Sequence, residues 1–484
     1  MSKEKMRKPL LSRQLYCPSH FGNTYEATMP TEMTALLHEA KFWGFNKFAD
    51  WFNGIDLCNI YNDNYNQNHR QFNMPEALWE RKFSNYKCAS DLGFDLGLNI
   101  TPNHVFLDQL TPENRAEAKT RRYFGQLVCP SKPEVTDMIL ENYRNLFRDF
   151  VEHGLQLDSI SAIAYDYGGC SCDQCNPWVV TFGKLYKEIS SIAKDVFGEI
   201  NIDILGWWWS DEDHQNFTNW ADTEAPGLFH SLAFFLDGGA TKYAVRPIPK
   251  NCKEDAFVHI AYSEHSDIYT HYGANIAPDR IEKTIENLFS RKAAGVMAYS
   301  EGDHDDINKA IAGGLASGQF ASADEVLQEY AARYFGTNPK RWSELIYLLG
   351  DFNTIDIDKC KPLFKNLSKD SKKSWRLQQI EERINMAKAH QSVMAEVSDA
   401  PLMDAVYAMD QKKSNNGVMN IRWTPRQKVA AEEFVAAKER LYREVYRLGV
   451  VRHIFRFGAS MPCWYESFIR MKNEYRKKDF DYRC

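Results

Sequence analysis

Short apolar runs alternate with longer amphipathic stretches over the first two thirds of the chain. Eight short runs are rich in β-branched and aromatic residues, as strands are: residues 14–17, 45–52, 94–101, 159–167, 200–209, 228–235, 256–264 and 295–301. Stretches with helical spacing lie between them, at residues 30–43, 75–92, 133–153, 179–197 and 278–293, and most begin with proline, which favours a helix start. Eight strand–helix alternations over about 300 residues predict an α/β fold of the (β/α)8 type, a TIM barrel.

A doubly wound sheet is the main alternative to a barrel. Its glycine-rich phosphate fingerprint, G-x-G-x-x-G, follows none of the eight candidate strands, so the barrel is preferred. From about residue 323 the pattern is only helical, over residues 323–334, 342–349, 374–397, 424–446 and 450–457. We therefore predict a catalytic barrel over residues 10–322 and a C-terminal all-helical domain over residues 323–484.

Composition narrows the class of protein. The chain has 484 residues, of which 44% are hydrophobic, and a formal net charge of −6, which excludes a disordered chain and argues against a nucleic-acid partner. No apolar stretch has the length of a signal peptide or a membrane span, and the odd number of cysteines, 11, fits a reducing compartment. We expect a cytoplasmic protein with no membrane partner, and a homo-oligomer stays open.

Acidic residues stand at the ends of three candidate strands, where a barrel enzyme holds its active site. They are Asp166, Glu264 and Glu301. Strand side chains alternate, so Ala162, Ala164 and Asp166 share one face, and we expect Asp166 to point into the barrel mouth. Glycosidic bond cleavage requires such a pair of carboxylates, one to protonate the leaving oxygen and one to attack the anomeric carbon or activate water. In the alternative interpretation, Asp166 caps a turn and Glu301 only binds sugar hydroxyls.

Aromatic and polar residues at the strand ends predict a surface for sugar rings. Neighbours on a strand face opposite ways, so Trp207, Trp208 and Trp209 cannot all be core: at least one is expected to stack on a sugar, while others pack between strand and helix. The candidate substrate-binding residues are His20, Trp51, Asn99, Tyr167, Trp207, Trp208, Trp209, Tyr262, His265 and Tyr299. His259, in the middle of its strand, is interpreted as a core histidine.

The segment Cys170-x-Cys172-x-x-Cys175 has a spacing compatible with metal thiolates. A tetrahedral zinc site needs a fourth ligand, and none is adjacent in the sequence. A structural zinc, a cluster of free thiols that shapes the loop and a disulfide all stay open. Soft thiolates serve no hydrolytic role where an acid pair is available, so we favour a structural role and expect no catalytic cofactor.

Two stretches resemble known glycoside hydrolases. One is GQLVCPSKP at residues 125–133, followed after a helix by AYDYGGCSCDQCNP at residues 164–177. The other is GVMAYSEG at residues 295–302, leading to SADEVLQEYAARYFG at residues 322–336. Together they resemble the group of barrel enzymes that includes family 20 hexosaminidases, family 67 alpha-glucuronidases and family 163 endo-acting glucosaminidases.

The resemblance implies a glycoside hydrolase that cleaves O-glycosidic bonds of short oligosaccharides, and we expect it to be exo-acting. Family 20 enzymes carry an adjacent Asp-Glu pair after the fourth strand, whereas this chain has Asp166-Tyr167, which argues against substrate-assisted chemistry. Many retaining barrel glycosidases hold the acid/base on strand four and the nucleophile on strand seven. This carries over to Asp166 as general acid/base and Glu264 as nucleophile or base, with Glu301 as a substrate clamp or alternative acid. That placement favours retention of the anomeric configuration, although the short Asp side chain widens the gap between the two carboxylates.

Two other classes of function stay open. The barrel could bind carbohydrate or scaffold partners without catalysis, through its helical C-terminal domain. It could also be a metal-dependent enzyme built around Cys170, Cys172 and Cys175. Activity on a panel of aryl glycosides separates the first alternative from a hydrolase, and metal analysis addresses the second.

Overall fold

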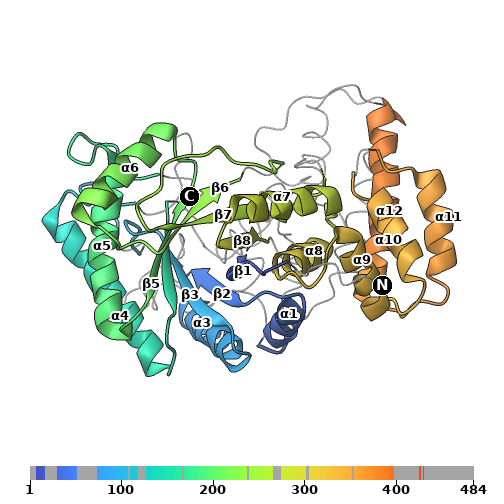
Figure 1. Ribbon diagram of the computed structural model, residues 1–484, viewed down its shortest axis with the longest axis horizontal. Coiled ribbons are helices and arrows are strands. Elements are labelled where there is room, and N and C mark those ends of the chain that lie inside the picture. The colour runs from blue at the N-terminus through green and yellow to red at the C-terminus, as the bar shows by residue number, and fades with distance from the viewer. Residues whose placement is uncertain are drawn as a thin grey trace.

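Eight parallel strands close into a barrel in the computed structural model (Figure 1). The structure describes residues 7–16, 30–51, 74–106, 109–117, 127–164, 168–236, 239–264, 274–300, 305–351 and 354–396, with residues 425, 426 and 429. The strands are β1 (Ser12–Tyr16), β2 (Lys47–Trp51), β3 (Asp95–Ile100), β4 (Ser159–Ile163), β5 (Asn201–Gly206), β6 (Ser231–Phe235), β7 (Lys253–His259) and β8 (Gly295–Tyr299). Pairing of β1 with β8 closes the ring, so the predicted TIM barrel and its eight strands are confirmed.

Helices cover the outside of the barrel. Those between the strands are α1 (Pro30–Phe42), α3 (Met74–Asp91), α4 (Pro133–Glu152), α5 (Trp178–Phe197), α6 (Asp211–Glu224) and α7 (Pro278–Arg291). After β8 follow α8 (Asp306–Ala316), α9 (Ala323–Tyr334), α10 (Pro339–Leu348), α11 (Ile357–Leu367) and α12 (Trp375–Glu396). Between β6 and β7, the described residues 239–252 form no helix. The five helices predicted within the barrel are confirmed within a few residues.

Alternate side chains of each strand face the barrel interior and the surrounding helices. On β8, Met297 and Tyr299 belong to a buried cluster inside the barrel, whereas Val296 and Ala298 belong to the larger cluster shared with the helices. On β4, only Ile163 belongs to the inner cluster, and Ala162 and Ala164 belong to the outer one. The face of those two alanines packs on the helices, so strand alternation gives no support to the prediction that Asp166 points inward. Asp166 itself lies outside the described residues, and its direction stays a prediction. β4 also ends at Ile163, short of the predicted end at residue 167.

The helices α9–α12 pack on one side of the barrel (Figure 1). Their buried residues Tyr330, Trp342 and Ile380 belong to the same hydrophobic cluster as the outer faces of the strands. An ion pair of 2.6 Å joins Arg376 of α12 to Asp306 at the start of α8. The predicted helices 323–334, 342–349 and 374–397 are confirmed as α9, α10 and α12, whereas α11 was not predicted. Helices 424–446 and 450–457 lie outside the described residues apart from three positions, and a domain boundary at residues 322/323 stays a prediction.

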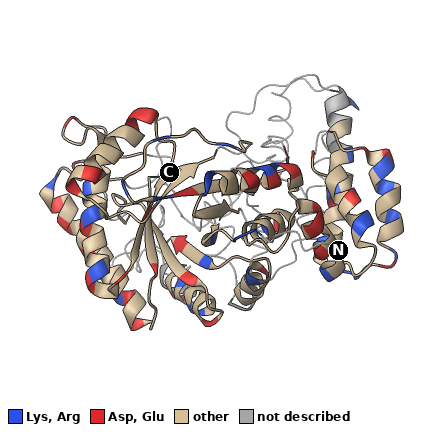
Figure 2. Cartoon of the chain, viewed as in Figure 1, with Lys and Arg blue, Asp and Glu red and all other residues tan. Residues whose placement is uncertain are grey.

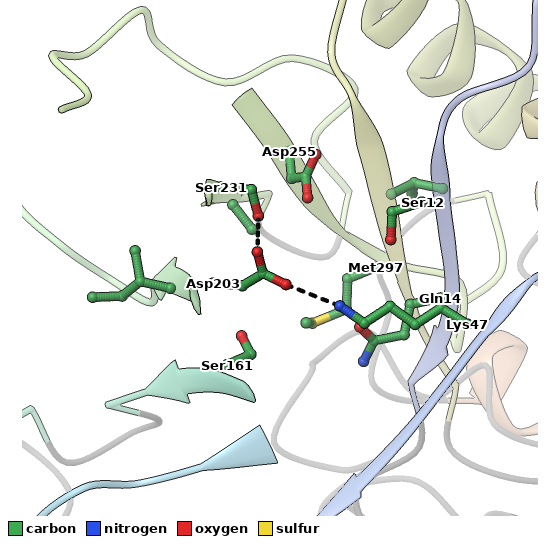
Figure 3. A pocket seen from close by; sticks show the side chains of 11 residues that line it. Ser12, Gln14, Lys47, Ser161, Asp203, Ser231, Asp255 and Met297 are labelled. Atoms are coloured by element: carbon green, nitrogen blue, oxygen red, sulfur yellow. Dashed lines mark hydrogen bonds and ion pairs between the residues drawn. The ribbon is translucent and has the colours of Figure 1, made fainter. Parts of the chain in front are cut away.

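A polar network fills the interior near the N-terminal ends of the strands (Figure 3). Asp203 of β5 accepts hydrogen bonds from Lys47 Nζ at 2.9 Å and Ser231 Oγ at 2.8 Å, and lies 3.1 Å from His230 Nδ1. A small cavity beside these groups is also lined by Asp255. In TIM barrels this end of the barrel contributes to stability and the opposite end holds the active site, so we interpret the network as structural.

Acidic and basic residues are interspersed along the outer helices (Figure 2). Within the part of the chain that the structure describes, no helix has both the length and the apolar character needed to cross a bilayer.

Candidate active site

A continuous row of aromatic rings lines the C-terminal end of the barrel from β5 to β8. We call it the aromatic arc, and its members are Trp207, Trp208, Phe235, His259, Tyr262 and Tyr299. Trp207 lies 4.6 Å from Phe235 between ring centroids and 6.2 Å from Trp208. The His259 ring lies between those of Phe235 and Tyr299, and its centroid is 5.8 Å from that of Phe235 and 4.8 Å from that of Tyr299. Phe235, His259 and Tyr299 are the last residues of β6, β7 and β8. Trp207, Trp208 and Tyr262 lie one to three residues beyond the ends of β5 and β7, so strand alternation and the segments after the strands together form the row.

The side chains of the arc become more exposed toward the outside of the barrel. Beneath it, Tyr16, Trp51 and Phe257 are at most 1% exposed and form the floor. Phe235, His259 and Tyr262 are partly exposed, and Trp208 is 53% exposed. Flat apolar faces that are accessible in this way can stack on sugar rings.

The three consecutive tryptophans have three different environments. Trp207 faces the barrel interior, and Trp209 packs between strand and helices against Phe217 and Trp178. Trp208 is solvent-exposed and has a φ of +53°, in the left-handed region that large side chains rarely adopt. The prediction that the three could not all be core is confirmed, and Trp208 is the one presented outward.

Asn99 of β3 is a fully buried amide at the same end of the barrel. Neither its Oδ1 nor its Nδ2 has a hydrogen-bond partner among the residues that the structure describes. Buried amides are rarely left in this state, because an unmade hydrogen bond costs about 1–3 kcal/mol. The amide can donate and accept at once, which suits a sugar hydroxyl.

His259 is the last residue of β7 and sits among aromatic rings. Burial lowers the pKa of its imidazole to about 3, so the ring is neutral at physiological pH. The prediction that His259 lies in the middle of its strand was wrong, because β7 ends at this residue. Its ring also contacts Tyr262 of the arc, at 5.2 Å between centroids. A neutral imidazole can hydrogen-bond a substrate, but it cannot serve as a general acid.

Glu264, the predicted nucleophile, binds the N-terminus of α7. Its Oε1 accepts the backbone N–H of Asp279 at 2.8 Å, and its Oε2 accepts that of Arg280 at 3.2 Å. The N-cap residue Ala277 has no side chain for this purpose, and Pro278 lacks an N–H, so Glu264 acts as a remote cap. Burial raises the pKa of the carboxyl, partly offset by these amide hydrogen bonds. Both oxygens thus accept a structural hydrogen bond.

Two buried side chains hold the backbone between β7 and α7. Arg280 donates to the carbonyls of His259 and Tyr262 at 2.7 and 2.8 Å, and Asn308 of α8 also donates to Tyr262, at 3.0 Å. The segment that carries Tyr262 and Glu264 is therefore fixed by hydrogen bonds on its helix side.

The remaining predicted site residues lie outside the described part of the chain. They are Asp166 and Glu301 among the acids, and His20, Tyr167 and His265 among the binding residues. Their roles stay predictions.

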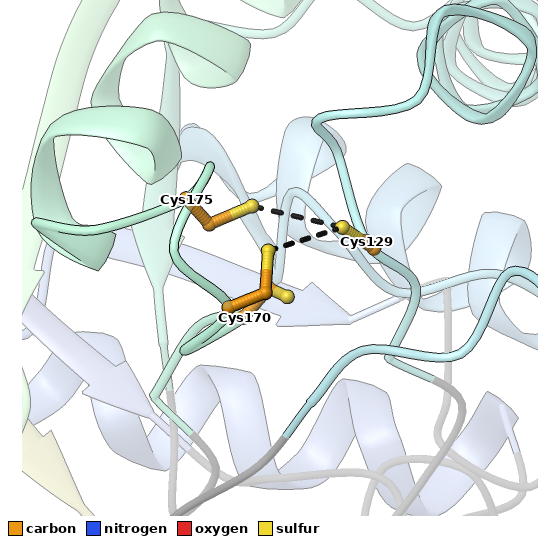
Figure 4. A group of neighbouring side chains, drawn as sticks. Cys129, Cys170 and Cys175 are labelled. Atoms are coloured by element: carbon orange, nitrogen blue, oxygen red, sulfur yellow. Dashed lines mark hydrogen bonds between the residues drawn. The ribbon is translucent and has the colours of Figure 1, made fainter.

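Four cysteine thiols gather at one place: three belong to the inner cluster and that of Cys172 packs against it (Figure 4). Cys170, Cys172 and Cys175 come from the segment after β4, and Cys129 comes from the segment before α4. Their sulfur atoms all lie within 4.8 Å of one another. The fourth thiol that the local spacing lacked is thus supplied from 41 residues upstream of Cys170.

The comparisons with known proteins identify the fold. No known protein family matches the chain, and no curated protein sequence does so either. Among solved structures, a GH138 enzyme targeting pectin rhamnogalacturonan II aligns with 99% of this chain and 69% of its own, at 11% identity and a TM-score of 0.51. A GH89 enzyme from Clostridium perfringens aligns with 90% of this chain and 54% of its own, at 10% identity and a TM-score of 0.52. The chain has the fold of barrel glycoside hydrolases. The predicted resemblance is confirmed at that level.

Sequence reasoning missed Phe235, His259 and Cys129. Alternation along β6 and β7 could have found the two rings, because Phe235 and His259 share the inward faces of Ala233 and Phe257. No local spacing could have found Cys129, since only the tertiary fold brings its loop against the segment after β4.

Proposed function

We propose that this protein hydrolyses O-glycosidic bonds of short oligosaccharides and acts at their ends. The observation that carries the proposal is the aromatic arc, together with the buried Asn99 amide, at the barrel end where TIM-barrel enzymes hold their substrates. Stacking faces and a hydrogen-bonding amide are the two kinds of group that a sugar ring requires.

For the reaction we propose Asp166 as general acid/base and Glu301 as the second carboxylate. The support for Asp166 is its position three residues after β4, at the barrel end that carries the arc, and not the alternation of side chains along β4. Glu301 follows Tyr299 of β8 by two positions, and Tyr299 is part of the arc. Glu264 is the weaker candidate because both of its oxygens already accept backbone N–H groups of α7. We assign Glu264 to positioning: it fixes the segment that carries Tyr262. One carboxylic acid then protonates the leaving oxygen, while the other carboxylate attacks the anomeric carbon or activates water.

The structural neighbours support a carbohydrate substrate. The GH138 enzyme targets rhamnogalacturonan II, and the GH89 enzyme is in complex with GlcNAc-alpha-1,4-galactose. Fragments of rhamnogalacturonan II and the disaccharide GlcNAc-alpha-1,4-galactose therefore both belong in the first substrate panel.

The test is hydrolysis of aryl glycosides and of those oligosaccharides by the full chain. We expect turnover of at least one substrate, and Asp166→Asn and Glu301→Gln should each lower kcat by about 10²-fold or more. Asp173→Asn is the matched control, because Asp173 is an exposed acid of the same segment after β4. Sugar binding without turnover by the unaltered protein would instead identify a carbohydrate-binding barrel. The first anomer seen by NMR shows whether the second carboxylate attacks directly or activates water.

A further inference from the structure

Four cysteines from two separate segments form one compact cluster on the active-site side of the barrel. Cys129 Sγ lies 3.8 Å from Cys172 Sγ and 3.7 Å from Cys175 Sγ, and Cys170 completes a set in which all sulfurs are within 4.8 Å. Cys129, Cys170 and Cys175 are buried, and Cys172 is partly exposed.

The two distances from Cys129 Sγ match the edges of a single tetrahedral site. A zinc ion bound by four thiolates has Zn–S bonds of about 2.3 Å, and a regular tetrahedron with that bond length has edges of about 3.8 Å. A disulfide would instead bring two sulfurs to about 2.05 Å, and all four thiols are free. The geometry therefore favours a metal over a cross-link.

The surroundings of the thiols fit the same interpretation. The N–H of Cys175 donates to the carbonyl of Cys172 at 3.0 Å, which folds the C-x-x-C segment into a tight turn. Ser131 Oγ lies 2.9 Å from Cys129 Sγ, where a hydroxyl can donate to a thiolate. Each of the two segments that supply the thiols thus has a hydrogen bond of its own next to the cluster.

We propose that Cys129, Cys170, Cys172 and Cys175 bind one structural Zn²⁺. Four protein ligands close the coordination sphere and leave no position for water or substrate, so the ion has no direct part in the reaction. Its role is to hold together the segments β3–α4 and β4–α5. A second contact already joins these segments, since Ser171 donates from both its backbone N–H and its hydroxyl to the carbonyl of Glu117, at 2.7 and 2.8 Å.

Metal analysis of the full chain, purified without chelator from zinc-supplemented medium, tests the proposal. We expect about one zinc per chain in the unaltered protein, and well under half of that in Cys129→Ser and in Cys172→Ser. Cys360→Ser is the matched control: Cys360 is a buried thiol of α11, outside the cluster, and its loss should leave zinc unchanged.

A second measurement, on the unaltered protein, tests the proposal even if the cysteine variants fail to fold. Titration of the unaltered protein with a mercurial thiol reagent should release the zinc and lower Tm by about 5 °C or more, because metal binding contributes to folding stability. Cobalt substitution should give the visible absorption of tetrahedral thiolate coordination. Absence of a stoichiometric metal from the folded protein, a stoichiometric iron instead of zinc, or full zinc retention in Cys129→Ser would overturn the proposal.

Discussion

Arg383 of α12 donates a hydrogen bond of 3.0 Å to Ser263 Oγ, just beyond β7, across 120 positions of sequence. The same guanidinium donates to the carbonyls of Leu349 and Gly350 at 2.8 and 3.3 Å. Gly350 in turn accepts the backbone N–H of Glu264 at 3.3 Å. Arg383 is fully buried, so this contact ties the C-terminal helices to the segment that carries Tyr262 and Glu264. The helices after the barrel thereby support the candidate active site directly.

Replacing Arg383 by Met should affect both stability and catalysis. We expect a loss of about 2–4 kcal/mol in the free energy of unfolding, because buried acceptors lose their donor. We also expect kcat/KM to fall by about tenfold through displacement of the β7–α7 segment. Arg376→Met is the control, since it breaks the 2.6 Å ion pair with Asp306 but does not touch that segment. Equal losses of kcat/KM in the two variants, at equal loss of stability, would argue against a specific role for Arg383.

Two substitutions of Glu264 distinguish a cap from a catalyst. Glu264→Ala leaves the N–H groups of Asp279 and Arg280 without their acceptor and should cost about 1–2 kcal/mol of stability. Glu264→Gln keeps one acceptor oxygen, so we expect kcat to stay within about tenfold of the unaltered enzyme, less than the loss of an acid–base catalyst.

Glu282→Gln is the matched control for these substitutions. Glu282 is also a partly buried carboxylate that accepts a helix N-terminal amide, that of Ala323 at 3.0 Å, but its contact is with α9. If Glu264→Gln lowers kcat by 10²-fold or more at unchanged stability, Glu264 returns to the catalytic pair, since that loss is the scale of an acid–base catalyst.

The barrel was predictable from the sequence because its strands and helices have local signals. Apolar runs such as residues 295–301 and proline-initiated helices such as α7 repeat with regular spacing. α11 was missed because its apolar residues are few, Cys360, Phe364 and Leu367 being its buried ones, and Pro362 stands inside it. Proline normally argues against a helix interior.

The candidate site was less predictable, because its contacts are not local. Strand-end position correctly placed Trp207, Tyr262 and Tyr299 in one row of rings. The same rule could not show that Glu264 reaches the end of α7, since this depends on Ala277 and Pro278 leaving two amides uncapped. The position of an acidic residue at a strand end thus predicts that it lies near the barrel mouth. It does not predict which groups its carboxylate binds.

Asp255 should make the protein less stable as the pH rises. Burial, and then the charge of Asp203, raises the pKa of the Asp255 carboxyl to about 6 from an ordinary value of 3.8. The folded state therefore favours the protonated form, whose stabilising contribution is complete below about pH 4 and is lost as the pH rises through 6. The shift corresponds to at most about 3 kcal/mol.

Asp255→Asn should remove this penalty. We expect the variant to be more stable than the unaltered protein at pH 8 and similar to it at pH 4, measured by urea unfolding at both values. Asp203→Asn is the contrasting variant: it leaves the Lys47 ammonium without its 2.9 Å partner and should be destabilising at pH 8. A loss of stability at pH 8 in Asp255→Asn would show that its ionised carboxylate is needed in the network.

Trp208 has an exposed side chain and a strained backbone, so its replacement should affect substrate binding more than stability. An aromatic residue at φ +53° carries a conformational cost of about 1–2 kcal/mol that glycine does not. Trp208→Gly should therefore change stability little, because relief of this strain offsets the loss of the part of the side chain that is buried against Trp207 and Phe235. The same change should raise KM for the substrate found in the panel by about tenfold, equivalent to about 1.4 kcal/mol of lost stacking.

Asn251→Gly is the control. It relieves a similar φ of +65° at the N-terminal side of β7, at the opposite end of the strand from the aromatic arc, and should leave KM unchanged. A Trp208→Gly variant with unaltered KM would remove Trp208 from the sugar-binding surface, and a large loss of stability would show that its ring is held in place for the fold.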